Sequence, residues 1–359
     1  MKKCRNLEEC CEPISMTNNL INGPSNVEQP PIPTTPTVPT VPTTPTVPTV
    51  PTGLNKVYGI MPLSGNTAVY NGFDESRVGT LPTFTFSRVF AIAVDPFRNL
   101  VYLAATTTPG TIYVFSAVDE QLITSFNLSI PNSQPQSITI NYVTNKIYIG
   151  TLTGRLFVLD RDTLVEEEII GEGVFPLQLT DVAINQQTNI LYVISGGLNS
   201  NELNVVNGAT NEIIGPFTDG LANPADVVVI EQTNTIYISN NNAGTVTVYD
   251  GSTLDLIAEI VVGARPNLMD FDPLRNELYV VNQVGSVTVI DTTTNTVLGT
   301  IDLEDPGANS VSIALNPFTR RAYVGITNRP RIDIIDMDLR IVIGALPIET
   351  GAFRVQTLP

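Results

Sequence analysis

The sequence predicts an all-β fold: a seven-bladed β-propeller of four-stranded blades, preceded by an extended Pro/Thr-rich stalk. The first observation is a repeat in which a Tyr recurs after 44, 46, 44, 45, 42 and 44 residues. The second is composition, because each copy is rich in Val, Ile, Thr and Tyr and is interrupted by Gly, Asn, Asp or Pro. Strands repeating at this period are typical of propeller blades. The aligned residues are Tyr58, Tyr102, Tyr148, Tyr192, Tyr237, Tyr279 and Tyr323.

The clearest copy of the repeat, residues 276–303, predicts three strands joined by tight turns. It reads NELYVVNQVGSVTVIDTTTNTVLGTIDL, in which LYVV, SVTVID and TVLGTIDL are separated by a Gly-containing turn and by TTTN. One more apolar segment precedes the Tyr in six copies, which makes four strands per blade. These segments are FAIAVDPFRN, SITINYVTN, DVAINQQTN, DVVVIEQTN, LMDFDPLRN and SVSIALNPFTR.

The two ends of the repeat region predict how the ring closes. No such first strand precedes Tyr58, whereas GAFRVQTLP at the other end matches the start of a blade and then stops. We therefore expect residues 352–358 to pair beside the Tyr58 strand and to complete the first blade. Closure of this kind removes an exposed sheet edge.

An Asn stands three positions before the Tyr in six copies, and Arg320 takes its place in the seventh. Asn tolerates the left-handed backbone conformation that a tight turn requires, so it predicts a strand-to-strand turn without invoking a ligand. The six residues are Asn55, Asn99, Asn145, Asn189, Asn234 and Asn276.

The repeats resemble the YVTN-type β-propeller repeats of microbial surface and surface-layer proteins. The segment NYVTNKIY at 141–148, the TVTVID-like strands at 245–250 and 286–291, and the TNTVxxTI strand at 294–301 carry the resemblance. It covers about residues 54–358 and implies the propeller fold. Members of this family have mixed or unknown activities, so the resemblance implies no particular chemistry.

Residues 1–29 form a polar arm that contains all three cysteines, Cys4, Cys10 and Cys11. The arm lacks the apolar core of a secretory signal and no stretch is long enough for a transmembrane helix, so we expect a soluble protein without conventional export. A bond between adjacent Cys10 and Cys11 would be strained, and three thiolates without His fall short of a zinc site. Two interpretations stay open: free thiols in a disordered tail, or disulfides to other subunits.

The segment KKCRNLEECCEP resembles the cysteine-bearing N-terminal connector of bacterial endospore appendage subunits. In that connector a Cys, a short spacer and a Cys-Cys pair link neighbouring subunits covalently. The resemblance implies intermolecular disulfides at Cys4, Cys10 and Cys11, other subunits of a surface or fibre assembly as partners, and a bacterial cell or spore surface as the location. Spore-surface proteins are exposed when the mother cell lyses, which fits the missing signal peptide.

Residues 30–53, PPIPTTPTVPTVPTTPTVPTVPTG, predict an extended spacer. Proline fixes φ near the polyproline II value and restricts the preceding residue in the same way. At about 3.1 Å per residue, the tract extends on the order of 70 Å. We interpret it as a stalk that separates the arm from a propeller at 54–359; a ligand for a Pro-binding domain and O-glycosylation of its threonines are alternatives.

The charge balance excludes two classes of partner. The chain has 18 Lys and Arg against 35 Asp and Glu, a net charge of −17. Nucleic-acid binding needs a basic patch, and none is present, so we expect no nucleic acid and no membrane insertion. The acidity is expected to serve solubility.

Catalytic patterns are scarce, and we assign no catalytic, cofactor-binding or metal-binding residue. The chain has no His, so neither a Ser-His-Asp triad nor a histidine-ligated metal is possible. No phosphate-binding Gly-rich motif follows a strand. The carboxylates that end the third strands, Asp160, Asp250, Asp291 and Asp336, are interpreted as turn caps. The acidic pairs Asp160/Asp162, Asp270/Asp272 and Asp336/Asp338 are alternatives for calcium.

A ligand site, if present, is expected at the channel mouth, where loops lead from one blade into the next. The candidate residues differ from blade to blade, as a binding surface and unselected loops both would. They are Arg88, Gln136, Asp181, Asp226, Asn267, Asn309 and Arg354.

Two classes of function follow from these features. The first, which we predict, is a non-enzymatic surface or spore-surface module, structural or adhesive, that is displayed on the stalk and cross-linked through the cysteines. The alternative is a ligand- or carbohydrate-binding propeller, or a propeller enzyme that acts at the channel mouth. A bound sugar or metal at the channel would distinguish the two.

Overall fold

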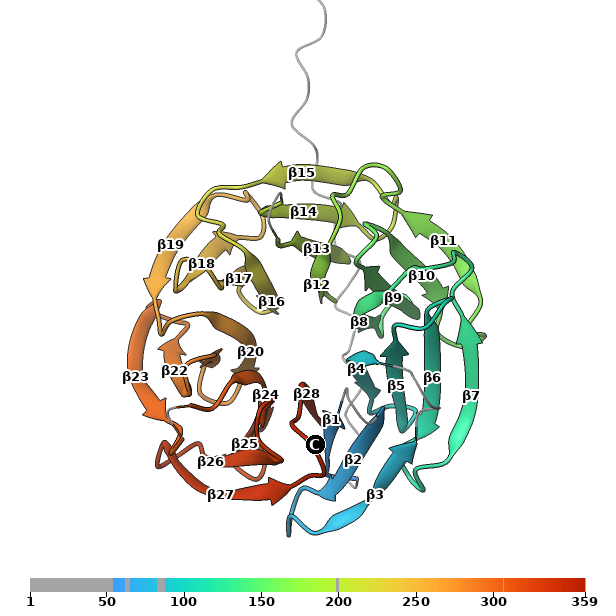
Figure 1. Ribbon diagram of the computed structural model, residues 1–359. Coiled ribbons are helices and arrows are strands. Elements are labelled where there is room, and N and C mark those ends of the chain that lie inside the picture. The colour runs from blue at the N-terminus through green and yellow to red at the C-terminus, as the bar shows by residue number, and fades with distance from the viewer. Residues whose placement is uncertain (1–53, 62–64, 83–87, 198–199, 306, 359) are drawn as a thin grey trace, which may run out of the picture. The chain divides into compact units, whose positions relative to one another are not determined.

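The computed structural model describes residues 54–358 except 62–64, 83–87, 198–199 and 306. The described residues form seven four-stranded antiparallel sheets arranged in a ring (Figure 1). The prediction of an all-β, seven-bladed propeller is therefore confirmed. No helix long and apolar enough to cross a membrane occurs in this part of the chain.

Each blade runs from an inner strand beside the ring axis to an outer strand on the rim. The inner strands are β28 (Arg354–Leu358), β4 (Val89–Asp95), β8 (Pro135–Asn141), β12 (Leu179–Asn185), β16 (Pro224–Ile230), β20 (Pro266–Asp272) and β24 (Ser310–Asn316). The second strands, which carry the repeated Tyr, are β1 (Lys56–Met61), β5 (Leu100–Ala105), β9 (Lys146–Thr151), β13 (Ile190–Ser195), β17 (Thr235–Asn240), β21 (Glu277–Asn282) and β25 (Arg321–Ile326).

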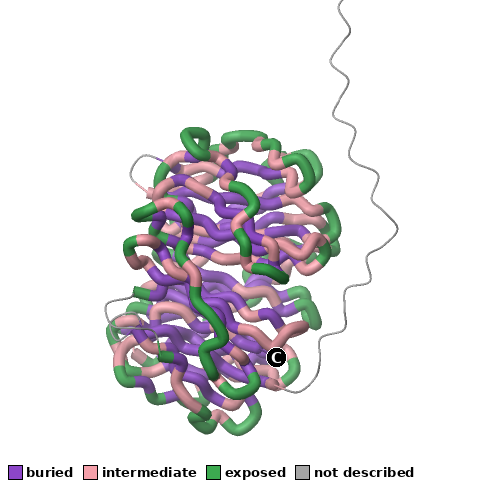
Figure 2. The backbone as a smooth tube through the Cα atoms, turned by 90° about the vertical axis from the view of Figure 1, so that its right-hand side faces the viewer, coloured by how far each residue is buried: buried purple, intermediate pink, exposed green. Residues whose placement is uncertain are grey.

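The remaining two strands of each blade complete the sheet toward the rim. The third strands are β2 (Asn66–Asn71), β6 (Thr111–Ser116), β10 (Leu156–Asp160), β14 (Glu202–Asn207), β18 (Thr245–Asp250), β22 (Ser286–Asp291) and β26 (Arg331–Asp336). The outer strands are β3 (Arg77–Pro82), β7 (Leu122–Asn127), β11 (Glu166–Ile170), β15 (Ile213–Phe217), β19 (Leu256–Val261), β23 (Thr296–Asp302) and β27 (Ile341–Pro347). Figure 2 shows that the exposed segments concentrate in turns and along the rim.

The last strand of the chain closes the ring. β28 pairs antiparallel with β1, and Gln356 lies opposite Tyr58. Just before β28, the Phe353 N–H donates to the Ile60 carbonyl at 2.8 Å. The prediction that residues 352–358 complete the first blade is confirmed, and both ends of the propeller are held in one sheet.

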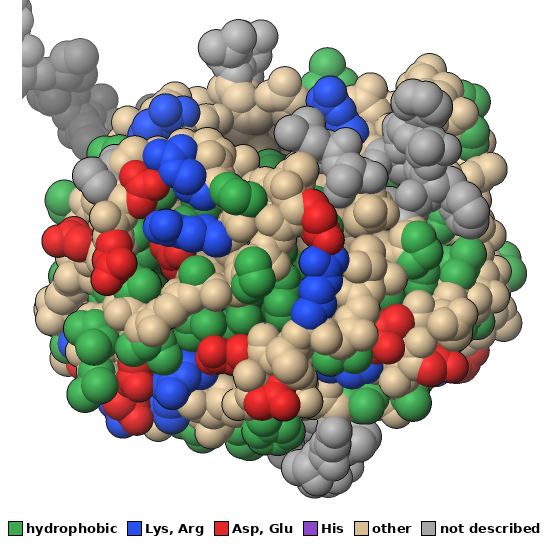
Figure 3. Space-filling model, turned by 60° about the horizontal axis from the view of Figure 1, so that its bottom comes forward, with side chains coloured by type: hydrophobic (Ala, Val, Ile, Leu, Met, Phe, Trp, Pro, Cys, Tyr) green, Lys and Arg blue, Asp and Glu red, His purple; other side chains and the backbone are tan. Residues whose placement is uncertain are grey.

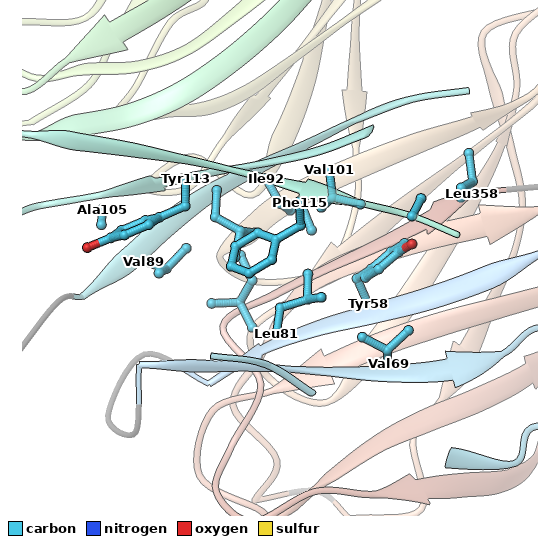
Figure 4. Close-up of a cluster of buried hydrophobic side chains, with 13 residues drawn as sticks. Tyr58, Val69, Leu81, Val89, Ile92, Val101, Ala105, Tyr113, Phe115 and Leu358 are labelled. Carbon is cyan, nitrogen blue, oxygen red and sulfur yellow. The ribbon is translucent and has the colours of Figure 1, made fainter. Parts of the chain in front are cut away.

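The hydrophobic core is divided into seven clusters, each between two neighbouring blades. Figure 4 shows the cluster between blades 1 and 2, where Tyr58, Leu81 and Phe115 from both sheets meet. The seven repeated tyrosines are at most 1% exposed. The Tyr repeat therefore marks the positions where one blade packs against another.

Among the described residues, each outer strand has one edge that pairs with no other strand, and a β-bulge lies next to that edge in every blade. In every blade the pairing of the third strand with the outer strand shifts register. Such bulges interrupt the edge and oppose pairing with other sheets. Figure 3 shows acidic and basic side chains interspersed with hydrophobic ones on the visible face.

The predicted turn conformation is confirmed at five of the six asparagines and at Arg320, which have φ between 50° and 61°. Asn55 is the exception. The inner strand of its blade, β28, is the last strand of the chain, so no strand-to-strand turn leads from an inner strand to Asn55. In three copies, the Asn three positions before the repeated Tyr also has a second role that sequence reasoning missed. Its Oδ1 accepts a hydrogen bond from an Asn that ends the inner strand of the preceding blade, in the pairs Asn141 to Asn189 (2.8 Å), Asn185 to Asn234 (2.7 Å) and Asn316 to Asn55 (2.6 Å).

Charged pairs replace these amide pairs at two junctions. Asp272, which ends β20, accepts from Arg320 at 2.5 Å, so the one copy without the turn Asn has an ion pair instead. Asp95, which ends β4, forms two hydrogen bonds of 2.5 and 2.6 Å with Arg161. Asp95 and Arg161 are 0% and 7% exposed, and the Arg161 guanidinium lies 5.0 Å from the centre of the Tyr142 ring.

Candidate functional site

The inner strands begin with an irregularity that changes where one side chain points. In β4, β8, β12, β16 and β24 the pairing passes from the first residue to the third, and in β20 it shifts between Pro266 and Met269. A bulge leaves the extra residue unpaired and re-aims its side chain. The residues at the second position are Phe90, Gln136, Thr180, Ala225, Asn267 and Val311.

Most of these residues line a cavity of about 270 Å³, which we call the mouth cavity. Gln136, Thr180, Ala225, Asn267 and Val311 belong to its wall, together with Phe353, which precedes β28. The turns after the second strands add Asn241 and Gln283. The mouth cavity is therefore rich in side-chain amides.

A second cavity of about 560 Å³, the channel cavity, is lined by residues of all seven inner strands. Most of the residues that line it are apolar, and its charged residues are Asp181, Asp226, Asp270 and Arg354. Arg354 also lines the mouth cavity, so the two cavities adjoin at this side chain. The channel cavity lies in the volume range of about 300–1,000 Å³ typical of small-molecule sites.

Asp181 and Asp226 form a pair of carboxyl groups on neighbouring inner strands. Asp226 is only 5% exposed, and its Oδ2 accepts a hydrogen bond from the Met269 N–H at 2.7 Å. Burial raises the pKa of Asp226 well above its usual range, and the charge of Asp181 and the hydrogen bond between the two carboxyl groups raise it further. Arg354 and the Met269 N–H oppose this shift. The balance favours the neutral, protonated form of Asp226.

Arg354 supplies the positive charge at the junction of the two cavities. Its side chain is half-buried, and it forms no ion pair or hydrogen bond with any residue in the described part of the chain. The Nε atom is buried without a partner. A buried donor without a partner is costly, so the guanidinium group is suited to an acceptor from outside the chain.

Asp270 shares the channel wall but has a different environment. Its Oδ2 accepts from the Leu315 N–H at 2.7 Å and its Oδ1 from the Phe271 N–H at 2.8 Å. Burial raises the pKa of Asp270, the two hydrogen bonds lower it, and the charge of Asp272 raises it. The resulting pKa is about 6. Because Leu315 belongs to the next inner strand, Asp270 also connects blades.

The channel-mouth candidates from sequence are partly brought together. Gln136, Asp181, Asp226, Asn267 and Arg354 line one or both cavities. Arg88 and Asn309 are exposed and belong to neither wall, because they precede the inner strands. Sequence reasoning missed Thr180, Asn223, Asn241 and Gln283, and it considered Asp270 only for calcium. Thr180 is the second residue of its inner strand, and this position in the repeat is the signal that could have identified it.

The acidic turn residues act as predicted. Oδ1 of Asp160, Asp250, Asp291 and Asp336 accepts from the backbone N–H two residues later in each case. In the three pairs considered for calcium, the second carboxylate is instead in an ion pair with arginine. The partners are Arg98 for Asp162, Arg320 for Asp272, and Arg275 and Arg320 for Asp338.

The cysteines and the stalk lie outside the described residues. Disulfides at Cys4, Cys10 and Cys11, the arm at 1–29 and the spacer at 30–53 therefore stay predictions. The same holds for subunit partners and for a surface location.

Comparisons with known proteins identify the fold and no family. No protein-family profile matches this sequence, and no curated protein matches it. The YVTN and endospore-appendage resemblances are thus not confirmed. Among solved structures, Kuenenia stuttgartiensis hydrazine synthase matches with a TM-score of 0.67 at 15% identity, covering 77% of this chain and 92% of that chain. Dihydro-heme d1 dehydrogenase NirN, in complex with DHE, matches with a TM-score of 0.63 at 13% identity, covering 86% and 77%.

These neighbours correct one sequence prediction. We predicted a non-enzymatic module, whereas both neighbours are named as enzymes. The prediction that the protein is not an enzyme is contradicted. It rested on the cysteine arm, the stalk and the scarcity of catalytic patterns, including the lack of His. The structure brings together carboxyl and guanidinium groups that lie far apart in the sequence. At 13–15% identity the likeness shows the fold alone.

Proposed function

We propose that the protein is a propeller enzyme that performs acid–base catalysis in its central channel. The observation that carries the proposal is the Asp181–Asp226 pair on the wall of a cavity, where burial and the neighbouring carboxyl group raise the pKa of Asp226. Two carboxyl groups that share a proton provide a donor and an acceptor at one place. Perturbed carboxyl groups in a cavity favour a catalytic role.

The reaction class that fits this pair is hydrolysis of a C–O bond. Asp181 would take a proton from water, and the water oxygen would form a new bond to the substrate. Asp226 would give its proton to the leaving oxygen, after which the proton on Asp181 returns to Asp226 through the hydrogen bond between them. Arg354 would bind an anionic group of the substrate.

The pair also has a structural role, which any test must separate from catalysis. Asp181 accepts from the Val227 N–H at 3.4 Å, and Asp226 accepts from the Met269 N–H, so both connect neighbouring inner strands. Asp226→Asn keeps an oxygen acceptor for Met269 and an N–H donor toward Asp181. It cannot transfer a proton, so it removes the proposed chemistry while keeping the contacts between blades.

The test is hydrolysis of para-nitrophenyl esters, glycosides and glucuronides by the full chain. We expect turnover of at least one class, and Asp226→Asn is expected to lower kcat about 100- to 10,000-fold while leaving the melting temperature nearly unchanged. Asp255→Asn, an exposed residue outside both cavities, is the matched control. Failure of the whole panel, or equal loss of activity in both variants, would refute the proposal.

A further inference from the structure

We infer that the two cavities accept a polyhydroxylated carboxylate, such as a sugar acid, with its carboxylate on Arg354 and its hydroxyl groups in the mouth cavity. This inference rests on the proposed function for the location of the site. It adds the chemical class of the substrate, which is argued from the mouth cavity and not from the carboxyl pair.

The carboxylate preference follows from the charges in the two walls. Arg354 is the one basic residue that lines either cavity of the described chain, and no acidic residue is ion-paired with it there. Its planar guanidinium group matches a carboxylate through two parallel hydrogen bonds. The raised pKa of Asp226 favours its neutral form, which leaves the Arg354 charge available to a ligand.

The hydroxyl preference follows from unused amides in the mouth cavity. The side chains of Asn267 and Gln283 are half-buried and make no hydrogen bond with other residues that the structure describes. Gln136 donates only to the carbonyl of its neighbour Pro135, at 3.3 Å. Each amide offers both donors and an acceptor, as a hydroxyl group requires of its partner. Three such amides suit a ligand with several hydroxyl groups better than a simple anion.

An aromatic side chain completes the mouth cavity. Phe353 lies beside Arg354 in the wall and packs edge-to-face against Phe90, with ring centres 5.2 Å apart and an interplanar angle of 83°. This contact holds Phe353 in place. Its ring offers an apolar surface for the C–H face of a sugar ring, next to the polar groups that fix orientation.

The first experiment measures binding by titration calorimetry, using full-length Asp226→Asn protein so that no turnover occurs. The probes are D-glucuronate and D-galacturonate, with D-glucose and acetate as comparisons. We expect at least one uronate to bind about tenfold or more tightly than glucose and than acetate, because glucose lacks the charge and acetate lacks the hydroxyl groups. No uronate binding, or equal binding of acetate, would overturn the inference.

Variants of the wall then assign the contacts. Arg354→Met is expected to weaken uronate binding about 10- to 100-fold, and Asn267→Ala or Gln283→Ala about 3- to 10-fold. Arg88→Met, an exposed arginine outside both cavities, is the matched control and is expected to have no effect. Wild-type binding by Arg354→Met would overturn the carboxylate contact.

The two proposals fail in different ways. Uronate binding without hydrolysis by the wild type would refute the acid–base function and leave the ligand class standing. Hydrolysis of neutral esters or glycosides, without uronate binding, would support the catalytic pair and refute the ligand class.

Discussion

The two ends of the inner strands differ in how strictly they repeat. At the final position, five of the seven strands end in Asn or Asp whose side chain bonds to the next blade or its turn. At the second position, the residues range from Phe through Gln, Thr and Asn to Val and Ala. The repeated end holds the blades together, whereas the varied end lines the mouth cavity.

This difference has a physical reason. Asn141, Asn185 and Asn316 are fully buried, and a buried amide without partners costs free energy, so both members of each pair are constrained. Most residues at the second position line a cavity, where water or a ligand can bind to their polar groups. Variation there costs little stability and allows a specific site to form.

The largest effect is expected at the repeated end, from Asp95→Ala. This change leaves the buried guanidinium of Arg161 without its partner and should lower the free energy of unfolding by about 3–5 kcal/mol. Urea denaturation measures the loss. Asp162→Ala, which removes the exposed partner of Arg98, is the control and should cost at most about 1 kcal/mol. Similar losses in both variants would contradict the special role of the buried pair.

A smaller effect, dependent on pH, is expected from Asp270, which lies between the two ends. Its pKa of about 6 in the folded state exceeds the unfolded value of 3.8, so the folded state binds more protons between these values. Stability should therefore fall as pH rises through this window, by about 3 kcal/mol at most.

Asp270→Asn isolates this contribution, because Asn does not titrate. The stability of wild type relative to Asp270→Asn, measured by urea unfolding from about pH 4 to pH 7, should decrease with rising pH. A constant difference between the two proteins would show that Asp270 does not titrate in this range.

The smallest effect on the propeller is expected from the N-terminal arm. Replacing Cys10 and Cys11 by Ser should leave the melting temperature unchanged and abolish any covalent oligomer on a non-reducing gel. The reason is that both residues precede the repeat region, whose core contains no cysteine. A large drop in melting temperature would contradict an arm that acts only in cross-linking.

The sequence predicted that several site residues lie at the channel, but it did not predict which of them contact each other. Asp181, Asp226 and Arg354 each stand near the start of an inner strand, so the repeat placed them at the channel. Sequence spacing could not show that Asp181 and Asp226 lie against each other, because they come from different blades. The bulges were also hidden, since the extra residue is seen only when the strand pairing is known.

The sequence by itself determined the number of blades, the strand order and the closure by residues 352–358. Tyr, Asn and alternating apolar residues act through local turns and neighbour contacts, and these repeat with the chain. Only the tertiary structure decided which charged groups meet in the channel and which remain unpaired. The ring brings Arg354 near Asp226 across more than a hundred residues. Burial there, not spacing, raises the pKa of Asp226, and the packing leaves the Arg354 Nε atom without a partner among the described residues.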